Sequence, residues 1–346
     1  MESSLNITDG GEMPLEVNIF YAVFIPVLIL LTVTGNIAIL VAFWKMPSLR
    51  EKPSELLILN LSCVDLSTGL IVLPYWSPVY ITPGTWPFGE VGCRILATFN
   101  NTTVHASLFA ISAISVDRFL LVMKEYPQYL RIQSRKRVYI TIIACWIFAL
   151  ATVIPQQGMW LRAKVIDETA REINFENLCL FPPRRVRLYS STMFVALYCL
   201  PVLLLCILSM AFLYFLRRRL KRNRQVEHTW PSTTTTQANL EDEGQQQGGR
   251  VSDAIPTVPT VRQPNTSRYI KPAVSLISIV SAMAICMLPY CLYVIIIELF
   301  CQRCNEPKVL YDLLLLQFCN ACLDPFFYGA TQKKIRRFYR SCMTIK

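Results

Sequence analysis

Polar and ionisable side chains interrupt several long apolar stretches of this sequence, and they are the first candidates for function. The segment FNNTTVHAS, residues 99–107, carries two asparagines, two threonines, a histidine and a serine. Asp65, the neighbours Asp117 and Arg118, and Asp324 interrupt other apolar stretches. Amides and carboxylates can bind a ligand or an ion, and an Arg beside an Asp can be released toward a partner. Alternatively, Asn, Thr and His can serve as hydrogen-bonding groups between helices.

The surroundings of these residues are those of a membrane protein. Of the 346 residues, 53% are apolar and 16% charged, whereas about 25% are charged in soluble domains. Seven stretches reach the roughly 20 apolar residues that cross a bilayer as a helix. They span about 19–44, 54–79, 90–121, 137–159, 189–216, 271–300 and 307–331. The sequence therefore predicts an all-α membrane protein, a seven-transmembrane helix bundle over 19–331, with a short amphipathic eighth helix and tail in 332–346.

The distribution of Lys and Arg predicts the orientation, because cytoplasmic loops retain an excess of both. They concentrate after the first, third and fifth spans and after the seventh, whereas the acidic segment 1–18 has none. We expect a multi-pass plasma-membrane protein with an extracellular N-terminus and no cleaved signal peptide. The net charge of +11 reflects this bias, so nucleic acid is not an expected partner. The polar stretch 223–267 predicts a disordered cytoplasmic loop.

Several modification sites follow from this topology. Cys93 opens the third span on the outer side and Cys179 lies in an outer loop, where an oxidising compartment lets such a pair form a disulfide. Cys301 and Cys304 in the outer loop CQRC form a second candidate disulfide, and a zinc site is the weaker alternative because four ligands are not in view. Cys342 follows a basic stretch and is a candidate for palmitoylation. Asn6, in Asn-Ile-Thr, is the expected glycosylation acceptor.

A set of motifs in the predicted spans resembles the rhodopsin-like (class A) G-protein-coupled receptors. The motifs, in order, are Gly35-Asn36, LNLSCVDL (59–66), Cys93, SVDRF (115–119), Trp146, Pro201, MLPY (287–290) and LDPFFY (323–328). The resemblance implies a receptor whose inner face opens around Asp117, Arg118 and Tyr328 to admit a heterotrimeric G protein, with arrestin and receptor kinases as further partners and membrane lipid around it. The outer-loop WPFG (86–89) and CQRC look closest to the amine branch, particularly histamine- and muscarinic-like receptors.

The ligand position departs from that amine branch. Amine receptors have an Asp seven residues after the span-three cysteine, and here that residue is Asn100, which cannot form an ion pair with an ammonium group. A biogenic amine therefore remains only the alternative to an unidentified small ligand. Helical spacing and the resemblance predict a mainly apolar pocket with a few amides. Its candidate residues are Asn100, Asn101, Val104, Met193, Leu197, Tyr290, Cys291, Val294, Leu314 and Phe318.

The switch positions depart as well. Met287 and Met283 replace aromatic residues near the span-six proline, and Tyr269 lies near the place where many relatives have an acidic residue that restrains Arg118. A weak restraint favours ligand-independent signalling, and the opposite interpretation is a non-signalling decoy, scavenger or dimer partner. Phe318 stands where a retinal protein needs a lysine. An enzyme is not expected, because no nucleophile, base and orienting group occur together outside the membrane.

An ion site is the one cofactor prediction. Asp65, Ser107, Asn320 and Asp324 match the positions that hold sodium at the centre of the family's helix bundle. Two neighbouring carboxylates in a low dielectric cannot both stay ionised without a cation or a proton. Bound sodium or a water cluster and a protonated carboxyl group are therefore the two alternatives.

Overall fold

The computed structural model describes residues 15–81, 86–124, 126–167, 199–229, 267–299 and 307–343, and these are almost entirely helical. Seven helical segments are long and apolar enough to cross a membrane, which confirms the predicted number and order of spans. The helices are α1 (Leu15–Lys45), α2 (Pro47–Arg50), α3 (Glu55–Ser67), the π-helical η1 (Thr68–Val72), α4 (Leu73–Ile81), α5 (Gly89–Met123), α6 (Tyr126–Ile132), α7 (Arg135–Asp167), α9 (Leu200–Thr229), α10 (Ser267–Leu299), α11 (Pro307–Thr331) and α12 (Lys333–Met343).

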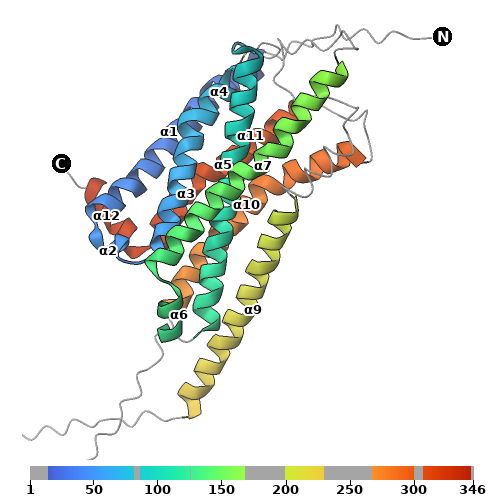
Figure 1. The fold of residues 1–346 in the computed structure, drawn as a ribbon. Helices are drawn as coiled ribbons and strands as arrows, with labels where there is room; N and C mark the ends of the chain where they lie inside the picture. The colour runs from blue at the N-terminus through green and yellow to red at the C-terminus, as the bar shows by residue number, and fades with distance from the viewer. Residues whose placement is uncertain are drawn as a thin grey trace, which may run out of the picture.

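The long helices run side by side in one bundle, with α5 between α3, α7, α9 and α10 (Figure 1). We call the end that carries Cys93 the outer end and the end that carries Arg118 the inner end, after the predicted orientation. The short helices α2, α6 and α12 lie at the inner end. There α12 is attached to α2 by a hydrogen bond of 3.1 Å from Lys334 Nζ to the carbonyl of Ser48. This α12 is the eighth helix that the sequence predicted.

The outward faces of the bundle are apolar, as a membrane requires. On α7, Ile140, Ile143, Ile147 and Ile154 are each more than half exposed. Their spacing of three, four and seven residues places them along one side of the helix. A row of large apolar side chains on the outside of a helix is stable only when lipid or another apolar surface covers it.

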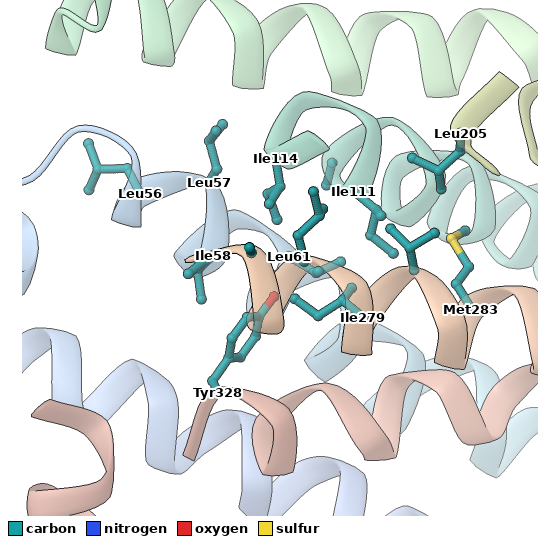
Figure 2. Packing of buried hydrophobic residues seen from close by; sticks show 14 of the residues in the cluster. Leu56, Leu57, Ile58, Leu61, Ile111, Ile114, Leu205, Ile279, Met283 and Tyr328 are labelled. Atoms are coloured by element: carbon teal, nitrogen blue, oxygen red, sulfur yellow. The ribbon is translucent and has the colours of Figure 1, made fainter. Parts of the chain in front are cut away.

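The inner half of the bundle is packed by aliphatic side chains around Tyr328. Leu56, Leu57, Ile58 and Leu61 of α3 meet Ile111 and Ile114 of α5, Leu205 of α9, and Ile279 and Met283 of α10 (Figure 2). Tyr328 of α11 is fully buried in this cluster. Burial on this scale holds the inner ends of five spans together through non-directional contacts.

Two further contacts join particular helices and explain residues of the sequence motifs. A Cβ atom on Gly35 would lie 3.0 Å from the Pro325 ring, tighter than an ordinary contact, so glycine favours this close approach of α1 to α11. The amide of the buried Asn36 then donates to the carbonyl of Ala321 at 3.1 Å. On the other side of the bundle, Trp146 Nε1 of α7 donates to Asn60 Oδ1 of α3 at 2.9 Å.

Three spans differ from the prediction, two of them in where the helix ends and one in that it contains a π-turn. The helix α9 continues to Thr229, so residues 223–229, predicted to belong to a disordered loop, are helical. Most residues past the predicted end of this span, in 217–229, are Arg, Leu, Lys, Gln or Glu, which have a high helix propensity in water. The helix α7 likewise continues past the predicted end at residue 159 to Asp167. In the second span, the π-turn η1 places Gly69 where an added Cβ would lie 2.9 Å from Thr32.

Candidate functional site

The segment FNNTTVHAS forms part of α5 in the outer half of the bundle, and three of its six polar side chains, Thr102, Thr103 and His105, bond to their own helix. Thr103 Oγ1 donates to the carbonyl of Asn100 at 2.8 Å. His105 Nδ1 lies 2.6 Å from the carbonyl of Asn101, so it must carry the proton that it donates. Asn100 differs, because its side-chain oxygen is buried and has no hydrogen-bond partner among the described residues. Asn100 and, one face of the helix further in, Ser107 are therefore residues of this segment with a buried acceptor still to satisfy.

The other predicted pocket residues are distributed over two levels. Cys291 of α10 and Phe318 of α11 are buried, and Tyr290, Val294 and Leu314 are half-buried. Met193 and Leu197 lie outside the described residues. Val104 and Phe318 line a cavity below the level of Asn100, together with residues predicted for the ion site.

This central cavity has a volume of about 30 Å³, enough for an ion or a small water cluster. Five helical elements contribute to its walls. The lining residues are Asp65 and Thr68 from the second span, Thr103, Val104 and Ser107 from α5, Met283 and Met287 from α10, and Gln317, Phe318, Asn320 and Ala321 from α11. The structure thus brings Asp65, Ser107 and Asn320 together, as the ion-site prediction expects.

Unsatisfied oxygen atoms converge on the cavity. Asp65 Oδ2, Ser107 Oγ, Gln317 Oε1 and Asn320 Oδ1 are buried and have no hydrogen-bond partner within the described ranges. Asp324, the fourth residue predicted for the ion site, is not part of the cavity lining. Both of its carboxyl oxygens are likewise buried without a partner in these ranges, and the group interacts electrostatically with that of Asp65. Buried acceptors are costly unless something donates to them or coordinates them. Carboxylate, amide and hydroxyl oxygens suit a hard cation or ordered water.

The composition of this oxygen set limits the kind of cation. Among the described residues, no group of three or more His, Cys, Asp and Glu side chains could hold a metal ion. Two carboxyl groups with neutral oxygens suit a hard cation better than a soft transition metal, which prefers sulfur and imidazole ligands.

At the inner end, Arg118 is buried and paired. Arg118 Nη1 lies 3.2 Å from Asp117 Oδ2, and the hydroxyl of Tyr129 in α6 donates to Asp117 Oδ1 at 3.0 Å. Burial raises the pKa of the Tyr129 hydroxyl, and the Asp117 carboxylate raises it further, so this donor stays protonated at physiological pH. Tyr328 is fully buried nearby. This arrangement keeps the guanidinium group inside the protein.

Arg219 of α9 caps the inner end of α5, the helix that carries Arg118. Its guanidinium group donates to the carbonyl of Lys124 at 2.9 Å and to that of Val122. The last carbonyls of an α-helix have no partner in the helix itself, so a cation from a neighbouring helix is a favourable cap.

The modification predictions fall mostly outside the described residues. Cys93 is disulfide-bonded, and its predicted partner Cys179 lies outside the described part of the chain, as do Cys301, Cys304 and Asn6. Cys342 lies in the last turn of α12, and nothing is described of its side chain.

Sequence reasoning missed three site residues. Gln317 could have been found, because it shares a helix face with Asn320 and Asp324 at spacings of three and four residues. Tyr129 carries no such signal, since its contact with Asp117 comes from the path of the loop after α5. At the outer end, the hydroxyl of Tyr21 in α1 donates to Asp312 Oδ1 in α11, a pairing that one sequence does not reveal.

Comparison with known proteins gives a family model that matches residues 35–328, described as 7 transmembrane receptor (rhodopsin family). The neuropeptide Y receptor type 1 of Xenopus laevis is 25% identical over 97% of this chain and 85% of that receptor. The D(1) dopamine receptor of Carassius auratus is 32% identical over 47% of this chain and 46% of its own length. The allatostatin-A receptor of Bombyx mori is 28% identical over 52% of this chain and 48% of its length.

Proposed function

Because this chain belongs to the rhodopsin family of seven-transmembrane receptors, we propose that it signals by coupling ligand binding between its outer half-spans to a heterotrimeric G protein at its inner end. The buried Asp117–Arg118 pair is the observation that supports this proposal most directly. A guanidinium group held inside by one carboxylate, which a tyrosine hydroxyl holds in turn, is a group that a change of helix positions can release. The family is one of receptors and not of enzymes.

The proposed orientation has the N-terminus outside the cell and α12 against the cytoplasmic leaflet of the plasma membrane. The loop charges support it, and so does the composition of α12. Its residues Lys333, Lys334, Arg336, Arg337 and Arg340 carry positive charge, while Ile335 is fully buried against the bundle. Basic amphipathic helices favour the anionic cytoplasmic leaflet. Arrestin and receptor kinases are proposed partners of the same inner surface.

The proposed ligand is uncharged at the group that meets Asn100, or is a peptide that meets it with a backbone or side-chain donor. Asn100 supplies a buried carbonyl oxygen without a partner, and such an atom accepts a hydrogen bond from an N–H or O–H group. The relatives named for neuropeptide Y and allatostatin A are compatible with a peptide. A biogenic amine is the alternative, and the match to a receptor named for dopamine is what favours it.

The proposed ion site consists of Asp65, Ser107, Asn320 and Asp324, with Gln317 as an additional oxygen donor. A sodium ion would satisfy several acceptors at once and neutralise one of the two carboxylates. A proton on one carboxyl group is the alternative, because it also removes the repulsion between Asp65 and Asp324.

A non-signalling decoy, scavenger or dimer partner is the second candidate function. Met283 and Met287 favour it, because flexible methionine side chains line the cavity where the resemblance leads one to expect aromatic residues. High basal signalling is the opposite consequence of the same substitutions. The two interpretations differ in whether any transducer responds.

The test is a screen of neuropeptides, biogenic amines and neutral lipids on cells that express wild type, Asn100→Asp or Asn101→Asp. Asn101 is equally buried, and its position one step round the helix makes it a matched control. We expect an amine response only in Asn100→Asp, because that carboxylate would face an ammonium group. An amine response of the wild type would overturn the ligand proposal. Silence of every variant in a panel of G-protein and arrestin sensors, at verified surface expression, would leave the decoy.

A further inference from the structure

The side chain of Glu55 lies at the inner end of the second span without a partner of its own. Glu55 is the first residue of α3, where a negative charge is favourable beside the helix N-terminus. One of its carboxylate oxygens, Oε2, is nevertheless buried and has no hydrogen-bond partner among the residues that the structure describes. A carboxylate in this condition needs a nearby positive charge.

The positive charge nearest in the network is Arg118. Glu55 interacts electrostatically with both Arg118 and Asp117, and with the hydroxyl of Tyr328. The preceding residue, Ser54, forms a side-chain hydrogen bond with Tyr129, which in turn donates to Asp117. The beginning of α3 therefore interacts with the Asp117–Arg118 pair electrostatically, through Glu55, and by hydrogen bonds through Tyr129 of α6.

Negative charges outnumber positive ones in the cluster of Glu55, Asp117 and Arg118. Arg118 contributes one positive charge, and Asp117 and Glu55 contribute two carboxylates. Arg118 is only 6% exposed and Asp117 4%, so solvent screens their interactions weakly. Moving the guanidinium group out of this place separates it from two carboxylates and leaves them close to each other. Both effects oppose the movement.

We propose that Glu55 is a positioning residue that holds Arg118 in its buried place, so that the second span supplies a restraint on the switch. This inference rests on the proposed function for its signalling consequence. It is the alternative to the weak restraint expected from Tyr269, because an acidic group on α3 would take the place of the one that the sixth span lacks.

The first experiment measures the cluster without any signalling. Hydrogen–deuterium exchange of the purified full-length protein would be followed in α6 and in the last turn of α5 for wild type, Glu55→Gln and Glu51→Gln. Glu51 is exposed, lies four residues earlier and loses the same charge, so it is a matched control. We expect exchange in both segments to rise about fivefold in Glu55→Gln and to stay unchanged in Glu51→Gln.

Two more variants separate a charge effect from a packing effect. Glu55→Asp keeps the charge on a shorter side chain and should restore slow exchange, which a purely structural role would not predict. Glu55→Ser is a second neutral variant, with melting temperature as the check that each protein is folded. Equal exchange in wild type and both neutral variants would overturn the inference.

The second experiment measures basal G-protein dissociation for the same variants at matched surface expression. We expect about a fivefold rise in Glu55→Gln over wild type, and none in Glu51→Gln. Faster exchange with no signal from any variant would retain Glu55 as a restraint and count against the proposed function. A basal signal in wild type that Glu55→Gln leaves unchanged, with unchanged exchange, would retain the proposed function and remove the role of Glu55.

Discussion

Replacing Asp65 by Asn should abolish a stabilisation of the protein by sodium. Asp65 is buried in the wall of the central cavity, where its carboxyl group adjoins that of Asp324. In the wild type, a bound cation would relieve the repulsion between two carboxylates and would coordinate acceptors that otherwise have no partner. The amide of Asn carries no charge, so the variant no longer needs the cation.

The size of the effect follows from the size of the cavity. A volume of about 30 Å³ accommodates a single cation and not several. For one bound ion, each tenfold rise in sodium above its dissociation constant adds about 1.4 kcal/mol to the free energy of unfolding. With roughly 2–4 °C for each kcal/mol, the melting temperature should rise by a few degrees for each tenfold rise in sodium.

The assay is thermal unfolding of the purified full-length protein in detergent, with sodium chloride exchanged for choline chloride at constant ionic strength. Asp312→Asn is the matched control, because Asp312 is an exposed carboxyl group of the same helix α11 and contacts Tyr21 instead of the cavity. It should keep the sodium dependence of the wild type even if its absolute stability falls. Equal slopes for wild type and Asp65→Asn would refute the reasoning, and a wild type without any slope would favour the protonated carboxyl group.

Two further predictions concern the hydrogen bond between α7 and α3 and the titration of Tyr339 in α12. In thermal unfolding, Trp146→Phe should lower the free energy of unfolding by roughly 0.6 kcal/mol more than Trp76→Phe does. The reason is that Trp146 Nε1 donates to Asn60, whereas Trp76 Nε1 has no partner in the described chain. Similar losses in the two variants would show that this hydrogen bond does not stabilise the bundle. Burial raises the pKa of Tyr339 in α12 from 10.0 to about 12. Because the folded state favours the neutral phenol, Tyr339 should stabilise the fold fully below pH 10, and this stabilisation should be lost as the pH rises toward 12. Ultraviolet titration of the wild type against Tyr339→Phe would measure the pKa. Titration of Tyr339 near pH 10 would contradict the prediction.

The spans themselves could be predicted from the sequence because a bilayer imposes one strong requirement, about 20 apolar residues per helix. The four residues predicted for the ion site, Asp65, Ser107, Asn320 and Asp324, came instead from the resemblance to the receptor family. The ends of α7 and α9 could not be predicted by the same criterion, because polar residues with high helix propensity continue a helix beyond the membrane without any change in hydropathy.

The parts of the site that could not be predicted depend on contacts between distant segments. Glu55 and Tyr129 reach Asp117 and Arg118 from α3 and α6, and neither position has a periodicity that indicates this. The π-turn η1 is similar, since its extra residue shows only in how Gly69 packs against Thr32. Hydropathy and spacing describe one helix at a time, whereas these features belong to pairs of helices.

The hydrogen bonds of α5 have a mechanical consequence. Thr102, Thr103, Ser112 and Ser115 all donate to carbonyls of α5 itself. By contrast, Asn36 fastens α1 to α11 and Trp146 fastens α7 to α3 across the space between helices. These four hydroxyl groups therefore put no directional bond between α5 and its neighbours, and aliphatic contacts resist sliding less than hydrogen bonds do. The fastened pairs behave as a frame, whereas α5 is tied near its two ends, by the disulfide of Cys93 and by the bonds from Arg219 of α9.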